Sequence, residues 1–409
     1  MPDQPTTFRQ SVSVLRSGLF ARYMVAEFIS MVGAWMQTQA QQFFVEEKAH
    51  SSIEQALISA ALMIVIPLFG PWGGSLADRL DRRRILITVI SIQALLALAQ
   101  GVLVQGQWFQ LWQLTVIAVI MGITHAFEGP AYSALLPALV PREKLGAAVA
   151  MDRSVFHAGR IIGPALAGLM VAYLGLASAF YANALSFIGP LLILLTIPPR
   201  ALGTPEEEAA RRTGFLDGWR FVRSDAPTMR MVVMMAASAL FCSPFVMILL
   251  TFYARRTLGL DPSQVGWLMS LTGVGALGAS FALLAISVAK RPAFLRVGAA
   301  FTVISMLVLA VAEHFALAAL AYGVLTLGLN FIFGIGNQLV QERAPDVLRG
   351  RVSAIASLSF VAVVPFSGIF AALLDGWIGM RAALTVCAIG YGLLMAALFT
   401  FHWRRDQTE

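Results

Sequence analysis

Twelve apolar stretches follow one another along the chain, and short polar or glycine-containing breaks separate most of them. Each is long enough for a helix to cross about 30 Å of hydrocarbon, which takes about 20 residues. The stretches are residues 18–45, 54–77, 84–105, 110–138, 144–174, 177–198, 229–254, 263–289, 293–312, 315–341, 351–375 and 381–402. This pattern predicts an all-α polytopic membrane protein with twelve transmembrane helices.

One long polar segment, residues 199–228, interrupts this series after the sixth stretch. It predicts two six-helix halves, residues 1–198 and 229–409, joined by a cytoplasmic linker. Within the linker, apolar side chains recur at helical spacing, which predicts a short amphipathic helix. Two interpretations of this helix remain open: it lies on the membrane surface, or it caps the helical bundle.

The two halves also share a sparse repeat. Pro141, Gly146 and Gly175 have counterparts at the same spacing in the second half, namely Pro345, Gly350 and Gly379. This spacing predicts that the halves are six-helix pseudo-repeats that run in the same direction through the membrane.

Composition and charge support the membrane assignment. Of the 409 residues, 58% are hydrophobic and only 12% are charged, which excludes an ordinary soluble protein. The net charge is +7, but the basic residues are scattered among short loops, so we expect no nucleic-acid partner. Their distribution predicts a multi-pass protein of the cytoplasmic (inner) membrane with both termini in the cytoplasm. We expect a monomer in the lipid bilayer.

A charged turn between the second and third stretches resembles the loop 2–3 signature of the major facilitator superfamily, G-x-x-x-D-R-x-G-R-R. The matching residues are Gly74, Asp78, Arg79, Arg82 and Arg83, whereas Asp81 replaces the second glycine. The resemblance implies that this turn is a conformational latch. Asp81 reaches left-handed backbone conformations less easily than glycine, so the turn is expected to differ in shape.

The fifth stretch resembles the G-x-x-x-G-P-x-x-G-G signature of exporters in that superfamily. The residues that carry it are Gly159, Gly163, Pro164 and Gly168, with Ala167 in place of the first of the paired glycines. The resemblance favours export over uptake. Close packing of small residues between helices would also explain the pattern.

Ionisable residues inside the apolar stretches are concentrated in the first half. They are Glu128, Arg160, His125, His157 and Glu27. Each such charge costs on the order of 3 kcal/mol unless it is paired or hydrated, so these residues are candidates for function. Either Glu128 takes up and releases a proton while Arg160 and the histidines tune its affinity, or Glu128 and Arg160 form a permanent ion pair between two helices.

Candidates for the substrate cavity are amide and aromatic side chains, which suit an amphipathic or largely apolar molecule. They are Asn330, Asn337, Gln338 and Gln341 in the tenth stretch and Tyr132 in the fourth. The alternative for each amide is a structural role in helix packing.

The whole chain resembles the proton-coupled drug and siderophore exporters of the superfamily, of the enterobactin-exporter type. This resemblance implies a secondary antiporter that moves amphipathic small molecules by rocking its halves. A lysophospholipid transporter is the first alternative and a membrane-embedded enzyme the second. We expect no enzyme activity, cofactor or metal, because no H-E-x-x-H motif occurs and no lysine sits in a nucleotide-binding G-x-x-x-x-G-K-S/T motif.

Overall fold

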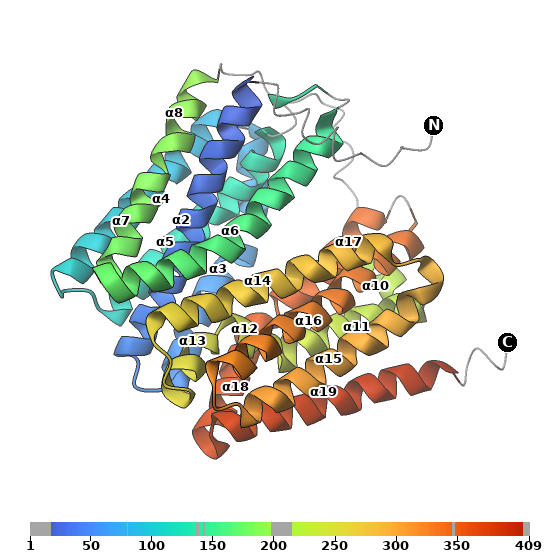
Figure 1. Cartoon of the computed structure of the whole chain (residues 1–409). Coiled ribbons are helices and arrows are strands. Elements are labelled where there is room, and N and C mark those ends of the chain that lie inside the picture. Colours follow the sequence, from blue (N-terminus) through green and yellow to red (C-terminus); the bar gives the residue numbers. More distant parts are fainter. Residues whose placement is uncertain are drawn as a thin grey trace. The chain divides into compact units, whose positions relative to one another are not determined.

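The computed structural model describes residues 18–79, 81–135, 139–141, 144–197, 215–345 and 348–403. Every regular element in these ranges is a helix (Figure 1). Ten of the described helical segments are long and apolar enough to cross a membrane, and two shorter apolar helices, Ser52–Val65 and Ala226–Phe241, occur where the second and seventh spans are predicted. The chain is therefore an all-α polytopic membrane protein.

The chain divides into two compact units. The first contains residues 1–48 and 64–204, and the second contains residues 49–63 and 205–409. The helix α3 (Ser52–Arg79) contributes its beginning to the second unit and its remainder to the first. Hydrogen bonds hold that beginning in the second unit, because Gln55 Nε2 donates to Ile248 O over 2.6 Å and Ser52 Oγ donates to Ala372 O over 3.4 Å.

The first unit is built around α2, which packs against α6 and α7, and α4, which packs against α5 and α7. Its fully buried side chains include Phe20 of α2, Leu86 of α4 and Leu194 of α8. Besides the second part of α3, the helices are α2 (Gly18–Lys48), α4 (Arg82–Gln105), α5 (Leu111–Leu135), α6 (Leu145–Leu174), α7 (Leu176–Ser186) and α8 (Ile188–Thr196).

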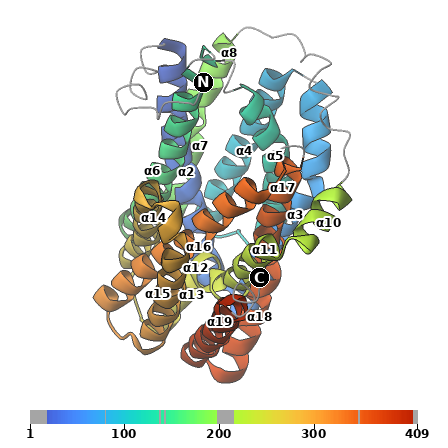
Figure 2. The ribbon, with the colours of Figure 1, turned by 90° about the vertical axis from the view of Figure 1, so that its right-hand side faces the viewer.

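The second unit is built around α16, which packs against α14, α15, α11 and α17 (Figure 2). Glycines permit this packing: a Cβ atom on Gly275 would meet Gly323 O, and one on Gly298 would lie 2.8 Å from Gly328 O. The elements are α10 (Phe215–Ser224), α11 (Ala226–Phe241), α12 (Ser243–Met247), α13 (Leu250–Phe252), η4 (Tyr253–Thr257), α14 (Pro262–Ala285), η5 (Val288–Lys290), α15 (Arg291–Val311), α16 (Phe315–Arg343), α17 (Arg349–Val361), α18 (Val364–Ile378) and α19 (Met380–Trp403).

The repeat predicted from the sequence has a structural counterpart in two turns. Gly175 joins α6 to α7 with φ 82° and ψ 164°, and Gly379 joins α18 to α19 with φ 81° and ψ 157°. Side chains other than glycine rarely adopt this backbone conformation, so the same residue is required at both turns.

The predicted seventh span, residues 229–254, is not one continuous helix. It is divided into α11, α12, α13 and the π-helix η4. Pro244 at the start of α12 has no N–H to continue the preceding helical hydrogen bonds, which accounts for a break there. Carbonyls near the break are satisfied by other helices, because Tyr322 Oη donates to Phe245 O over 3.1 Å and Gln55 Nε2 to Ile248 O.

The predicted amphipathic helix of the linker is α10. It packs against α17, where Gly218 lies close to Arg351 and Ile355. Arg351 Nη1 also lies 3.4 Å from Asp217 Oδ2, and Val222 is fully buried. This packing agrees with the interpretation that the helix caps the bundle.

Candidate functional site

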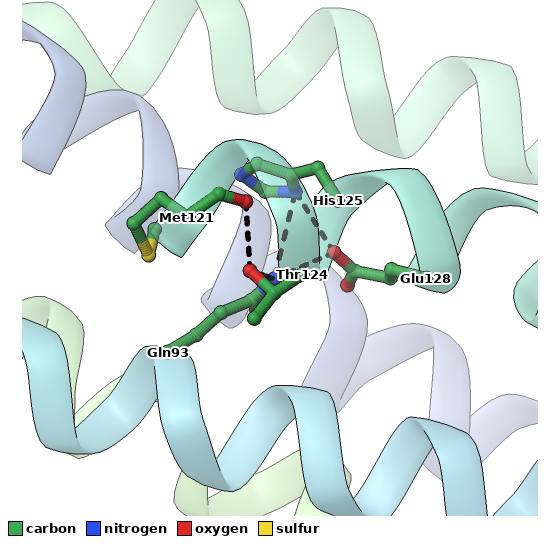
Figure 3. A network of polar contacts seen from close by, with 5 residues as sticks. All are labelled: Gln93, Met121, Thr124, His125 and Glu128. Atoms are coloured by element: carbon green, nitrogen blue, oxygen red, sulfur yellow. Dashed lines mark hydrogen bonds and ion pairs between the residues drawn. The ribbon is translucent and has the colours of Figure 1, made fainter. Parts of the chain in front are cut away.

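A polar network in the first unit joins α4 to α5 at Glu128 (Figure 3). Glu128 Oε2 lies 2.9 Å from His125 Nδ1 and accepts a hydrogen bond of 2.8 Å from Gln93 Nε2. Gln93 Nε2 also lies 3.3 Å from Thr124 Oγ1. The carboxylate therefore has one partner on its own helix and one on the neighbouring helix.

Helical geometry explains this arrangement. His125 and Glu128 are three residues apart on α5, which places their side chains on one face. Gln93 is 1% exposed, whereas the side chains of His125 and Glu128 are 46% and 27% exposed. The amide thus contacts the pair from inside the unit, whereas His125 and Glu128 each keep part of their surface outside the packed interior.

Arg160 does not pair with Glu128, so the interhelical ion pair considered from the sequence is not formed. Its guanidinium carbon instead lies 5.8 Å from the centre of the Trp35 ring on α2. The Nε atom of Arg160 and the Nδ1 atom of His157 are buried without a hydrogen-bond partner in the described part of the chain. Arg160 and His157 are therefore separate from the Glu128 network.

A second polar cluster involves Tyr132, which the sequence suggested for the substrate cavity. Its hydroxyl donates to Asp152 Oδ1 on α6 over 2.5 Å, and its ring lies 6.2 Å from that of Tyr23 on α2. Glu27, one turn further along α2, lies within electrostatic range of Asp152 and Glu128. The first unit thus places three carboxyl groups near one another, of which Glu128 has the histidine partner.

The predicted latch is described in part. Gly74, Asp78 and Arg79 lie in the last turns of α3, but their side chains lie outside the described residues, and Arg82 begins α4. Asp81 has φ −62° and ψ 112°, and it caps α4 by accepting a 3.0 Å hydrogen bond from the Arg83 backbone N–H. At the position of the second glycine in the loop signature, this chain therefore has Asp81 with an extended backbone, and Asp81 is the N-cap of α4.

Arg83 connects two helices of the first unit. Its Nε donates to Leu194 O over 2.7 Å and its Nη2 to Leu195 O over 2.9 Å. These carbonyls belong to the last turn of α8, where the helix dipole favours a positive charge. Arg83 thus links the C-terminal end of α8 to the N-terminal end of α4 by hydrogen bonds.

The exporter-type motif on α6 forms the contact with α2. A Cβ atom on Gly159 would lie 2.6 Å from Met31 Cγ, and one on Gly163 would lie 2.5 Å from Trp35 Cβ. Gly168 and Pro164 are buried, and α6 continues through Pro164 without a break. The motif therefore brings two backbones close together, which is the packing role considered from the sequence.

The amide residues of the second unit all lie on α16. Asn330 Nδ2 donates to Thr326 O of its own helix over 2.7 Å. Asn337 and Gln338 are partly exposed, and Gln341 is exposed and accepts a hydrogen bond at its backbone carbonyl from Arg349. The side chain of Asn330 thus has a local structural contact, whereas Asn337 and Gln338 remain candidates for substrate contact.

Gln93 and Trp35 are among the residues of these clusters that were not predicted from the sequence. Gln93 lies in the middle of the apolar stretch 84–105, where a polar amide is itself a signal. Trp35 carries no such signal, because a tryptophan is common in a membrane span. Among the described residues, no group of three or more His, Cys, Asp or Glu side chains could hold a metal ion.

Comparison with known proteins identifies the family of the chain. The model of a family described as transmembrane secretion effectors matches residues 9–409. The chain is 28% identical over 393 residues to an uncharacterized MFS-type transporter, YfiS, of Bacillus subtilis (strain 168), covering 92% of this chain and 91% of that protein. It is 26% identical over 365 residues to the multidrug efflux pump Tap of Mycolicibacterium fortuitum, covering 84% and 86%.

Solved structures share the fold. A bacterial homolog of the human lysosomal transporter Spinster, in an inward-facing and unoccupied conformation, matches with a TM-score of 0.73 and 12% identity. The match covers 96% of this chain and 97% of that chain.

Proposed function

The chain belongs to the transmembrane secretion effector family of major facilitator transporters, and on this premise we propose that it exports amphipathic small molecules in exchange for protons. Glu128 is the proton site in this proposal. The family and the relatives are transporters, which excludes the alternative of a membrane-embedded enzyme. The similarity to a multidrug efflux pump supports export over uptake.

The observation that carries the proposal is the 2.9 Å contact between His125 Nδ1 and Glu128 Oε2. One proton can be held in this pair in two ways, as a charged histidine with a carboxylate or as a neutral histidine with a carboxylic acid. A second proton gives a charged histidine beside a neutral acid. The pair then gains one positive charge and loses its ionic attraction.

Gln93 favours the first of these states, because its amide N–H donates to the carboxylate over 2.8 Å. When Glu128 is protonated, this hydrogen bond weakens, since hydrogen bonds to a charged acceptor are roughly twice as strong as neutral ones. Protonation therefore changes the contact between α4 and α5. We infer that this change is coupled to the alternating movement of the two units.

The chain lies in the cytoplasmic membrane with both termini in the cytoplasm, as the distribution of basic residues predicts. The amphipathic substrate contacts Asn337 and Gln338 of α16. Energy comes from the proton gradient.

The test is proton flux in proteoliposomes with an imposed pH gradient. Ethidium, an amphipathic cation, and 1-pyrenebutyrate, an amphipathic anion, serve as probes of the wild type, Glu128→Gln and Glu47→Gln. Glu47 is an exposed glutamate of α2 and is the matched control. We expect a probe to drive proton flux in the wild type and in Glu47→Gln, and the flux to be lost in Glu128→Gln.

Two outcomes would contradict the proposal. If flux in Glu128→Gln equals that of the wild type, Glu128 is not the proton site. If neither probe drives flux but lysophosphatidylcholine still crosses the bilayer, the chain is a lysophospholipid transporter rather than a proton-coupled exporter.

A further inference from the structure

Arg160 is a cation within a membrane-crossing helix, and among the described residues no acidic side chain forms an ion pair with it. It lies within the apolar part of α6, and its Nε atom is buried without a hydrogen-bond partner in the described residues. An arginine at such a depth costs on the order of 3 kcal/mol unless it is paired or hydrated. Its contact with the Trp35 ring, 5.8 Å from the guanidinium carbon, compensates for part of that cost.

The described carboxyl groups near Arg160 in the first unit have other partners or neighbours. Glu128 contacts His125 and Gln93, and Asp152 contacts Tyr132. Glu27 lies in electrostatic range of the other carboxyl groups, but no described ion pair joins it to Arg160. Within the described part of the chain, the positive charge of Arg160 is therefore left without an acidic partner.

A second unsatisfied nitrogen lies on the same face of α6. His157 is three residues before Arg160, and its Nδ1 atom is buried without a partner in the described part of the chain. The ring of Phe156 lies between two other rings: its centre is 5.6 Å from that of His157 and 5.8 Å from that of Trp35. Two nitrogen groups thus adjoin an aromatic surface.

Close packing keeps this cluster in place. Gly159 and Gly163 bring α6 against Met31 and Trp35 of α2, so the Cβ atom of Trp35 lies directly against the helix that carries Arg160. Arg160 and Trp35 are both partly exposed, so the cluster is not completely covered by the rest of the protein. A preorganised cation beside aromatic rings suits a ligand with an anionic group on an apolar body.

We propose that Arg160, His157 and Trp35 bind the anionic group of the transported molecule, so that the substrates include amphipathic anions with a carboxylate, sulfonate or phosphate. This inference rests on the proposed function, because it assigns the substrate class of the exporter. The guanidinium pairs with the anion, and the rings of Trp35 and Phe156 contact the apolar body.

The test is equilibrium binding to the full chain in phosphatidylcholine nanodiscs, without a gradient. The probes are 1-pyrenebutyrate and 1-pyrenebutanol, which differ in the carboxylate, and the readout is energy transfer from tryptophan to pyrene. We expect the wild type to bind the carboxylate at least tenfold more tightly than the alcohol. Arg160→Gln should remove this difference, and Arg160→Lys should retain part of it.

Arg153→Gln is the matched control, because Arg153 lies on the same face of α6 and is exposed. It also removes one positive charge, but we expect it to keep the preference for the carboxylate. Trp35→Phe should lower the energy transfer from tryptophan to bound 1-pyrenebutyrate. Thermal unfolding of each variant, together with binding of 1-pyrenebutanol, separates loss of the site from loss of the fold.

Equal binding of the two probes by the wild type would overturn the proposal. An Arg160→Gln variant that loses no more affinity for the carboxylate than Arg153→Gln would overturn it too. Octanoate and phosphatidylglycerol distinguish the two sources of an anion: displacement of 1-pyrenebutyrate by octanoate supports a free substrate, whereas displacement by phosphatidylglycerol alone assigns the site to a lipid headgroup and overturns the substrate assignment.

This experiment is independent of proton coupling. Anion binding that persists while Glu128→Gln leaves proton flux unchanged would contradict the proposed proton site alone. Coupled flux with equal binding of the carboxylate and the alcohol would contradict only the substrate class.

Discussion

His125 Nδ1 lies 2.9 Å from Glu128 Oε2 on one face of α5, and the two groups form a hydrogen-bonded pair within a single helix. Because the pair is local, its geometry does not depend on a contact between distant parts of the chain. Its support comes from α4, where the buried amide of Gln93 reaches the same carboxylate oxygen.

Gln93→Leu removes this support. We expect the free energy of unfolding to fall by about 1–3 kcal/mol, because a buried hydrogen bond to a charged group contributes about that much to stability. Thermal unfolding measures this change. Substrate-driven proton flux should also fall several-fold. Gln100→Leu is the control, since Gln100 is equally buried on α4 but bonds to Gln41 instead. Equal effects of both variants on flux would argue against a specific role of Gln93.

Gly163→Ala should destabilise the contact between α2 and α6. The added Cβ atom would lie 2.5 Å from Trp35 Cβ and 2.8 Å from Val32 O, so the helices must move apart. Overpacking of this kind costs about 1–3 kcal/mol. Gly376→Ala on α18 is the control, because a Cβ atom there meets nothing within 4 Å. Thermal unfolding in detergent measures both, and a wild-type midpoint for Gly163→Ala would contradict the packing argument.

Arg83→Gln should loosen the end of α8. It removes two hydrogen bonds, to Leu194 O and Leu195 O, together with a positive charge at a helix C-terminus. We expect a loss of about 1–2 kcal/mol in the free energy of unfolding, measured by denaturant titration. Arg84→Gln should have little effect, because the Arg84 side chain is 83% exposed and lies 3.9 Å from Asp81. The same effect from both variants would exclude a specific role for Arg83.

The ion pair between Asp225 and Arg343 predicts a dependence of stability on pH. Arg343 Nη2 and Nε lie 2.6 and 2.8 Å from the Asp225 carboxylate, and this contact lowers the pKa of Asp225 from 3.8 to about 2. A lowered pKa in the folded state means that the pair stabilises the fold above pH 3.8 and that this contribution is lost as the pH falls to about 2.

Asp225→Asn tests this dependence, because asparagine can still cap α11 but carries no charge. We expect the free energy of unfolding at pH 7 to fall by about 1 kcal/mol. The value is modest because the Arg343 side chain is 45% exposed and solvent screens the ion pair. The decline in the unfolding midpoint between pH 3.8 and 2 should become shallower. Arg343→Gln should reproduce both effects, and an unchanged pH profile in Asp225→Asn would contradict the assignment.

Part of the fold follows from local properties of the sequence. The apolar stretches predict most of the membrane-crossing helices, because crossing hydrocarbon requires a minimum length of apolar residues, and this length can be read without knowing any partner. The positions of Gly175 and Gly379 likewise predict two equivalent turns, and both have a positive φ near 80°. The break in the seventh span was not predicted, because its carbonyls are satisfied by Tyr322 and Gln55, which are distant in sequence.

The sequence by itself determined the class of protein, the spacing of its helices and the shared face of His125 and Glu128. Only the tertiary structure decided that Gln93 supports Glu128 and that Arg160 lies over Trp35 instead of pairing with that carboxylate. The physical reason is that helix length and helix face follow from neighbours along the chain. The partner of a charged side chain depends on which faces of different helices come together, and glycines such as Gly159 and Gly163 set how closely they do so.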